Sequence, residues 1–186
     1  MAYDLARGVT VLSGGYTSNG LPNAETWEWN GNTWTQRVDG PAANYAAAMV
    51  YDLERGVCVL FGGVTETGRS AGDTWEWNGS TWTIVSQVGP APRWGPAMAY
   101  DPANGATVLF GGTRCGGVAN GETWELSVGG SFCPADFNGD GFVDFFDYDT
   151  FVTAFEAGSP DADFNRDCFL DFFDYDGFFE AFETGC

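Results

Sequence analysis

The sequence contains no histidine and no lysine, so its seven basic residues are all arginines. Histidine is the usual acid or base near neutral pH and a common ligand of zinc and copper. Its absence argues against a zinc site, and against copper or histidine-based catalysis. The formal net charge is −19, and such an acidic protein is repelled by phosphate groups. We therefore expect no binding to DNA or RNA.

Long apolar runs are also lacking. No segment approaches the roughly 20 apolar residues of a membrane-spanning helix, and the first residues do not form a signal peptide. The five cysteines include no Cys-x-x-Cys pair. Cys58 lies in a strand-like run, where we expect a buried core residue. No membrane span is predicted.

The charge is unevenly distributed along the chain. Residues 133–186 carry 14 acidic side chains against one arginine, and residues 131–186 hold 14 of the 16 phenylalanines. A solvated acidic tail is one interpretation, but such tails lack aromatic residues. Acidic residues at fixed spacing among aromatics fit metal-binding loops better.

Residues 136–147 place side-chain oxygens at positions 1, 3, 5, 9 and 12 of a twelve-residue segment, with Gly141 at position 6. This is the spacing of an EF-hand loop, in which calcium takes about six to eight oxygen ligands. Residues 135–158 and 162–185 align without gaps and share 17 of 24 residues. Cys168 replaces the glycine in the second copy, and a side chain in that turn costs roughly 1 kcal/mol. We expect two calcium ions, the second bound more weakly.

The predicted ligands are side-chain oxygens and, at position 7, a main-chain carbonyl. They come from Asp136, Asn138, Asp140, Phe142, Asp144 and Asp147 in the first loop, and from Asp163, Asn165, Asp167, Phe169, Asp171 and Asp174 in the second. Position 12 is aspartate rather than the usual glutamate in both loops.

Each loop leads into an apolar helix. Tyr148, Phe151, Val152 and Phe155 fall on one helical face, and Tyr175, Phe178, Phe179 and Phe182 repeat the pattern. We expect the helices to be antiparallel and to pack through these faces. Antiparallel helices bring Cys133 and Cys186 together, so we predict a disulfide between them, worth roughly 4 kcal/mol.

Before residue 127 the dominant feature is a threefold repeat. Each copy opens with Tyr-Asp and continues with a β-rich run that ends in a glycine pair; these pairs are 48 and 49 residues apart. The runs are Val9–Ser13, Val57–Phe61 and Ala106–Phe110, followed by aromatic segments at 26–29, 74–77 and 123–126 and, in the first two copies, at 33–35 and 81–83. Short strands separated by glycine and asparagine turns indicate antiparallel four-stranded units.

This period, with its glycine pairs and downstream tryptophans, resembles the kelch repeat, which implies the blades of a β-propeller. The predicted fold is an all-β partial propeller of three four-stranded blades in residues 1–127, a linker over 128–132, and a small α-helical, EF-hand-like domain over 133–186. Closed propellers have at least about four blades. The first copy also lacks the segment that precedes Met49 and Met98. We therefore expect further blades and a signal peptide upstream of Met1, and an exposed strand edge.

Two calcium loops with aspartate at position 12, each followed by one helix, resemble a type I dockerin over residues 133–186. The resemblance implies calcium-dependent docking to a cohesin-like or cell-surface protein, often in polysaccharide degradation. Dockerins use positions 10 and 11, commonly small hydroxyl residues, in partner recognition. Those positions here are Phe145, Phe146, Phe172 and Phe173, the predicted partner-binding residues. Phe146 and Phe173 lie about 160° from the apolar face, so they either tuck under a neighbouring loop or anchor a partner.

Three functions are consistent with these patterns, and no catalytic residue is predicted. The preferred one is a non-catalytic extracellular or cell-surface protein, in which the propeller presents a surface for a carbohydrate or protein ligand and the dockerin-like module attaches it. The alternative is a fragment of a glycan-active enzyme, a glycoside hydrolase or carbohydrate oxidase. Glu28, Glu76 and Glu125 recur in every blade, which suggests a structural role instead. The third is an intracellular kelch adaptor with an acidic tail.

Overall fold

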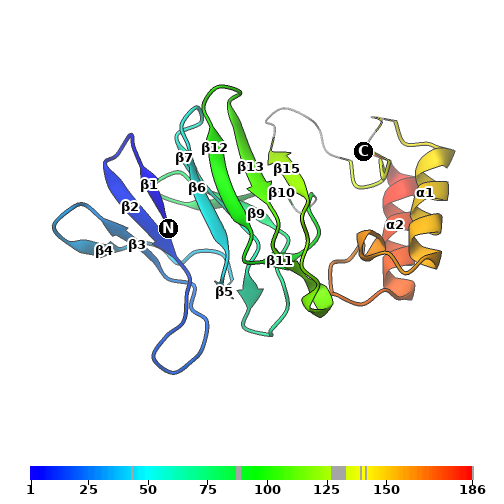
Figure 1. Cartoon of the computed structure of the whole chain (residues 1–186), viewed down its shortest axis with the longest axis horizontal. Helices are drawn as coiled ribbons and strands as arrows, with labels where there is room; N and C mark the ends of the chain where they lie inside the picture. The colour runs from blue at the N-terminus through cyan, green and yellow to red at the C-terminus, as the bar shows by residue number, and fades with distance from the viewer. Residues whose placement is uncertain (43, 87–88, 127–132, 139, 141, 186) are drawn as a thin grey trace. The chain divides into compact units, whose positions relative to one another are not determined.

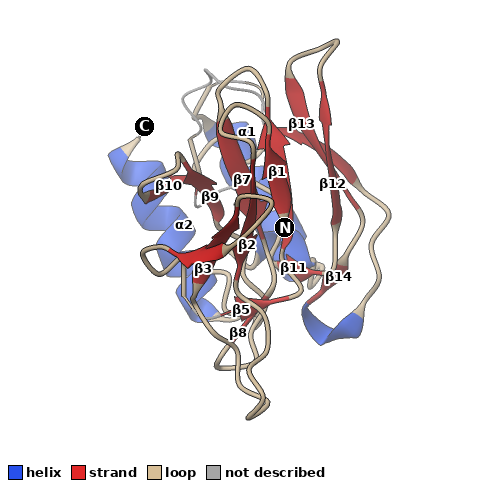
Figure 2. Ribbon diagram, turned by 90° about the vertical axis from the view of Figure 1, so that its left-hand side faces the viewer, coloured by secondary structure: helices blue, strands red, loops and turns tan. Residues whose placement is uncertain are grey.

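In this computed structural model the chain folds into two compact units, Met1–Ser127 and Val128–Cys186. The structure describes every residue except 43, 87–88, 127–132, 139, 141 and 186. The predicted linker over 128–132, Gly141 and Cys186 therefore lie outside the described residues. Every described strand belongs to the first unit and both α-helices belong to the second (Figure 2).

The first unit is built from antiparallel sheets that follow one another along the chain (Figure 1). The first sheet contains β1 (Ala2–Asp4), β2 (Val9–Ser13), β3 (Thr26–Trp29) and β4 (Trp34–Gln36). The second contains β6 (Ala48–Asp52), β7 (Val57–Phe61), β9 (Thr74–Trp77) and β10 (Trp82–Ser86). The third has three described strands, β12 (Ala97–Asp101), β13 (Ala106–Phe110) and β15 (Thr123–Leu126). Strands adjacent in sequence are neighbours in each sheet, as the repeat predicts.

Two short strand pairs and a 3-10 turn lie beside the glycine pairs. They are β5 (Asn44–Tyr45) with β8 (Val64–Thr65), β11 (Arg93–Trp94) with β14 (Thr113–Arg114), and η1 (Cys115–Gly117). Gly62 and Gly63 have φ angles of 74° and 103°, which glycine adopts without strain. A Cβ atom on Gly62 would lie 2.4 Å from the carbonyl oxygen of Arg93. The glycine pair therefore allows both the turn and the close approach of β11.

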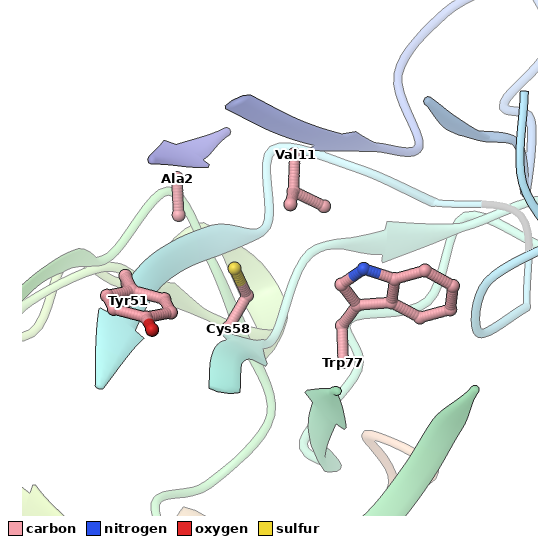
Figure 3. Packing of buried hydrophobic residues seen from close by; sticks show 5 residues of the cluster. All are labelled: Ala2, Val11, Tyr51, Cys58 and Trp77. Atoms are coloured by element: carbon pink, nitrogen blue, oxygen red, sulfur yellow. The ribbon is translucent and has the colours of Figure 1, made fainter. Parts of the chain in front are cut away.

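The core of the first unit lies between its first and second sheets. Directly opposite residues of antiparallel strands share a face, so Tyr51, Cys58 and Trp77 form a row across the second sheet. Ala2 and Val11 of the first sheet point toward this row (Figure 3). Cys58 is free and fully buried, which confirms the prediction, and burial raises the pKa of its thiol to about 12. The thiol is therefore inert and acts as a packing group.

Ion pairs connect two parts of the first sheet to Glu28, whose side chain is only 2 % exposed. Arg7 bridges Asp4 at 2.7 Å and Glu28 at 2.5 Å, while Arg37 lies 2.8 Å from the other oxygen of Glu28. Trp77 of the second sheet donates its indole N–H to Glu28 at 3.0 Å. The glutamate thus joins the β1–β2 turn and the end of β4 to the neighbouring sheet.

The second sheet repeats part of this arrangement. Arg55 pairs with Asp52 at 2.8 Å and also with Glu76. In the third sheet Asn104 stands where the arginine would be, and its amide donates to Asp101 at 2.7 Å. The recurrence of Glu28 and Glu76 is explained by these structural contacts.

The second unit contains α1 (Phe145–Glu156), α2 (Phe172–Thr184) and a 3-10 turn, η2 (Pro160–Ala162). The rings of Phe151 and Phe178 stack at 4.0 Å in the centre. Tyr148 near the start of α1 contacts Phe182 near the end of α2, and Phe155 contacts Tyr175. The helices are therefore antiparallel, as predicted.

The predicted apolar faces are largely correct. Phe151 and Phe178 are fully buried, and their neighbours on the predicted faces pack around them. Phe179 was expected in the core but is 40 % exposed. Its ring lies flat against Tyr175 at 6.4 Å, at the border of the contact rather than inside it. None of the described helices is both long and apolar enough to cross a membrane.

Candidate calcium loops

The first predicted calcium loop curls so that its side-chain oxygens face its own backbone. The N–H of Asp140 donates to Asp136 Oδ1 at 3.0 Å and to Asn138 Oδ1 at 2.8 Å. The N–H of Phe142 donates to Asp140 Oδ1 at 3.0 Å. Positions 1 and 3 therefore place their oxygens beside the same N–H group, on the inside of the loop.

The second loop repeats this geometry closely. The N–H of Asp167 donates to Asp163 Oδ1 at 3.0 Å and to Asn165 Oδ1 at 2.9 Å, and that of Phe169 donates to Asp167 Oδ1 at 2.9 Å. The N–H of Cys168 donates to the second oxygen of Asp163 at 3.0 Å. Two copies with seven differing residues in 24 thus make the same three hydrogen bonds at their described positions.

Position 12 is a buried aspartate in both loops. Asp147 is fully buried and accepts the N–H of Asn138 on one oxygen at 3.0 Å and that of Asp144 on the other at 2.9 Å. Asp174 makes the two equivalent contacts at 3.0 and 2.9 Å. A carboxylate oxygen has two lone pairs, so each of these oxygens retains one for a cation.

Position 9 connects each loop to its helix. Asp144 is the N-cap of α1 and accepts the N–H of Phe146 at 2.8 Å, while Asp171 caps α2 through Phe173 at 2.9 Å. The aspartate three residues after each cap completes a capping box by accepting the cap's own N–H. The predicted ligands at positions 9 and 12 therefore also start the helices.

The second loop concentrates negative charge around Asp163. Burial raises the pKa of this carboxyl to about 6, against hydrogen bonds from the N–H groups of Cys168 and Asp167, and the carboxylates of Asp174 and Asp167 raise it further. A bound cation would relieve this repulsion. Carboxylate and amide oxygens are the hard donors that calcium prefers, so the residues present fit calcium.

Cys168 adopts the left-handed backbone that position 6 requires, with φ at 72°. Most residues with a Cβ atom are strained in that region, which supports the prediction of a weaker second site. Cys115, Cys133 and Cys168 are disulfide-bonded, and for Cys115 and Cys168 no sequence pattern predicted this. The predicted Cys133–Cys186 pairing stays a prediction, because Cys186 lies outside the described residues.

The four predicted partner-binding phenylalanines are all exposed. Phe145, Phe146, Phe172 and Phe173 have exposed fractions of 67, 65, 68 and 67 %. No described loop covers them. Phe145 and Phe146 touch edge to face at 6.3 Å, and the equivalent pair does so at 6.4 Å. The exposed rings are available for contact with a partner protein. Binding of such a partner stays a prediction.

Sequence reasoning missed two further exposed rings. Phe142 and Phe169, considered there only as carbonyl ligands at position 7, are 73 and 61 % exposed. They lie three and four residues before positions 10 and 11 of the same loops, and this closeness was a signal that could have included them. The six exposed rings form two sets of three, one beside each loop, and because α1 and α2 are antiparallel the two sets lie at opposite ends of the helix pair. Phe142, Phe145, Phe146, Phe169, Phe172 and Phe173 are together called the phenylalanine surface below.

Comparison with known proteins defines the fold class. No family model matches the chain, and no curated protein matches it. Solved structures do match, and they support a mostly β fold with four-stranded antiparallel sheets that resemble kelch blades, together with two C-terminal helices. The comparisons give no support to the dockerin resemblance, which stays a prediction.

One of these structures is that of YjhT, a kelch-repeat propeller protein. The TM-score is 0.56 at 16 % sequence identity, and the match covers 67 % of this chain and 41 % of the YjhT chain. At this identity the likeness shows the fold alone. The kelch prediction is confirmed at that level, and this chain spans less than half the length of YjhT.

Proposed function

We propose that the protein is a non-catalytic extracellular binding and assembly protein. Its first unit presents a surface to a carbohydrate or protein ligand, and its second unit, loaded with two calcium ions, docks in dockerin-like fashion onto a cohesin-like or cell-surface protein. The observation that carries the proposal is the phenylalanine surface, whose six rings are 61 to 73 % exposed beside the two loops. Large exposed apolar groups are a mark of interaction surfaces.

Calcium would control this surface through the loop geometry. Phe142 lies within the first loop, and Phe145 and Phe146 begin the helix that Asp144 caps. An ion held by Asp144 and Asp147 would fix both the loop and the helix start, and so the positions of all three rings. Docking is therefore proposed to depend on calcium.

The glycan-active enzyme is the weaker alternative. Burial favours protonation of Glu28, but hydrogen bonds from Trp77, Arg7 and Arg37 outweigh it and lower the pKa of this carboxyl. A glutamate held ionised by three donors suits an ion pair better than an acid catalyst, whose pKa is normally raised. Glu76 is likewise paired with Arg55. Disulfide-bonded cysteines also favour an extracellular location over the reducing cytosol.

The proposal is tested first by titrating calcium into the full chain by calorimetry, which should detect two ions. Secreted and cell-surface proteins of the source organism are then passed over the immobilised chain with calcium or with a chelator. A partner should be retained only with calcium and should be lost with the double variant Phe146→Ala, Phe173→Ala. Leu21→Ala, equally exposed at 63 % but in the first unit, is the matched control.

Two outcomes contradict the proposal. If the chain binds no calcium, the prediction of two calcium-binding loops is wrong. A Phe146→Ala, Phe173→Ala variant that loses its helical circular dichroism shows that these rings support the fold instead of a partner.

A further inference from the structure

The two predicted calcium loops differ in sequence at positions 4 and 6. The first loop has Gly139 and Gly141 there, and the second has Arg166 and Cys168. Arg166 and Cys168 have φ angles of 60° and 72°, in the left-handed region that glycine adopts without strain and that disfavours residues with a Cβ atom. The second loop therefore holds two residues in a backbone conformation that their own preferences oppose.

The backbone of Cys168 determines two hydrogen bonds of its loop. Its own N–H donates to Asp163 Oδ2 at 3.0 Å, and the N–H of the next residue, Phe169, donates to Asp167 Oδ1 at 2.9 Å. Both peptide groups are planar and adjoin the Cα atom of Cys168, so its φ and ψ angles fix their relative direction. Asp163 and Asp167 are predicted ligands at positions 1 and 5. Their carboxylates are therefore oriented by the left-handed conformation of Cys168.

Cys168 is also restrained by a covalent bond. It is half-buried and disulfide-bonded, and a disulfide reduces the conformational freedom of the chain that it joins. A cysteine without this bond would relax toward the extended or right-handed regions, which turns both N–H groups away from Asp163 and Asp167. The disulfide opposes that relaxation, so it takes the place of glycine in holding this turn.

We propose that the second calcium loop is redox-dependent and binds calcium well only while Cys168 is disulfide-bonded. This inference rests on the calcium binding in the proposed function and adds a regulation of one of its two sites. Reduction by a dithiol transfers two electrons to the disulfide. The sulfur–sulfur bond breaks, Cys168 and its partner cysteine become thiols, and the two thiols of the reductant form a disulfide. Exchange with a disulfide-carrying oxidoreductase reverses the reaction.

This dependence restricts the complete calcium module to oxidising surroundings. Thiols stay reduced in the cytosol, whereas disulfides form and persist outside it. The reduced chain then binds only one ion tightly, and the oxidised chain binds two. Phe169, Phe172 and Phe173 lie in and beside the second loop, so this half of the phenylalanine surface is fixed in position only after oxidation.

The test is a calorimetric calcium titration of the full chain with and without dithiothreitol. All variants carry Asp140→Ala, which removes an exposed ligand of the first predicted site but neither of the aspartates that cap α1. The remaining ion then reports on the second loop. Reduction should raise its dissociation constant about fivefold or more, the change that corresponds to a left-handed residue with a Cβ atom.

Cys168→Gly is the matched control, because it restores the glycine of the first loop and retains every other cysteine. Its second site should bind calcium equally well with and without dithiothreitol, which separates the role of Cys168 from the reduction of other disulfides. Cys168→Ser keeps a side chain but not the bond, and it should bind as weakly as the reduced chain under both conditions. Circular dichroism confirms that each variant keeps its helices.

Three outcomes overturn the proposal. Equal affinity of the second loop before and after reduction does so, and leaves the two-ion docking module of the proposed function intact. An equal loss of affinity on reduction of Cys168→Gly would assign the effect to other disulfides. If the oxidised wild-type chain binds no calcium at all, the calcium dependence in the proposed function is wrong as well.

Discussion

One aspartate in each predicted calcium loop connects the loop to its helix and would also bind the ion. Asp174 is fully buried, accepts the N–H groups of Asn165 and Asp171, and lies in the first turn of α2. Both of its oxygens act as acceptors. An amide in its place would turn an N–H donor toward a backbone N–H, which leaves a buried group unsatisfied.

Asp174→Asn should therefore reduce the number of bound calcium ions from two to one and lower the helical content. Asp176→Asn changes the charge equally at an exposed position of the same helix and should retain two ions. Calorimetry and circular dichroism measure both. Two ions at unchanged affinity in Asp174→Asn would show that position 12 is not a ligand.

Glu122 contributes to the acid stability of the first unit. Although burial favours protonation, hydrogen bonds from Trp124, Asn120 and Arg93 and the charge of Arg114 lower the pKa of this carboxyl to about 2. Its folded pKa lies below its ordinary value of 4.5, so its stabilisation is complete above pH 4.5. That stabilisation is lost as the pH falls toward 2.

Glu122→Gln should lower the thermal midpoint of the first unit at neutral pH. It should also flatten the fall in stability between pH 4.5 and about 2. Glu66→Gln, at an exposed loop position, is the control and should follow the wild type. Equal acid sensitivity of Glu122→Gln and the wild type would contradict the assignment. Tryptophan fluorescence reports the transition.

At the scale of elements, α1 and α2 depend on a short contact centred on two rings. Phe151 and Phe178 stack at 4.0 Å and are fully buried, while the adjacent Phe179 is 40 % exposed. Phe137 and Phe164, from the second position of each loop, meet these rings edge to face at 5.4 and 5.6 Å. The loops thus contribute to the core that holds the helices.

Phe178→Ala should lower the free energy of unfolding of the second unit by about 3–5 kcal/mol. Phe179→Ala removes a phenyl ring from the adjacent position and should lower the free energy of unfolding clearly less, since much of the Phe179 ring already contacts water. Denaturant unfolding followed by helical circular dichroism compares the two. Similar losses for both variants would mean that the helix contact is wider than the structure shows.

Elements defined by local chemistry were predictable from the sequence. The runs Val9–Ser13, Val57–Phe61 and Ala106–Phe110 are strands with those bounds, because β-rich residues end there at glycine pairs. The loop spacing likewise predicted two similar loops, whose described residues make matching hydrogen bonds, while calcium binding stays a prediction. Oxygen donors at fixed intervals are a local pattern.

Features that depend on distant partners were not predictable. Arg93 is fully buried, and its guanidinium donates to the carbonyl of Gly111 and to Glu122, 18 and 29 residues away. Helical periodicity predicted that Phe179 is buried. Periodicity does not show, however, how much of this apolar face the other helix covers. Phe137 and Phe164 lie in loops, where no periodicity signals burial.

At the scale of the whole molecule, the two units carry separate spectroscopic probes. All eight tryptophans lie in residues 1–127, and both described α-helices lie in the second unit. Residues 133–186 hold 14 acidic side chains and one arginine. Without calcium this excess charge destabilises the second unit through repulsion.

Chelation of calcium should therefore lower the thermal midpoint of the helical signal and leave that of tryptophan fluorescence unchanged. Added calcium should restore the helical midpoint, and magnesium should do so less well because it is reluctant to lose its water. A helical midpoint that is insensitive to chelator would contradict calcium binding. A simultaneous shift of both probes would show that the units unfold together.

At the contact between α1 and α2, equivalent residues of the two copies meet each other. Phe151 stacks on Phe178, and the hydroxyl groups of Tyr148 and Tyr175 are 2.7 Å apart; each residue meets its own counterpart 27 positions along the chain. One loop with its helix is therefore complementary to itself, and a peptide of residues 135–158 should dimerise in calcium.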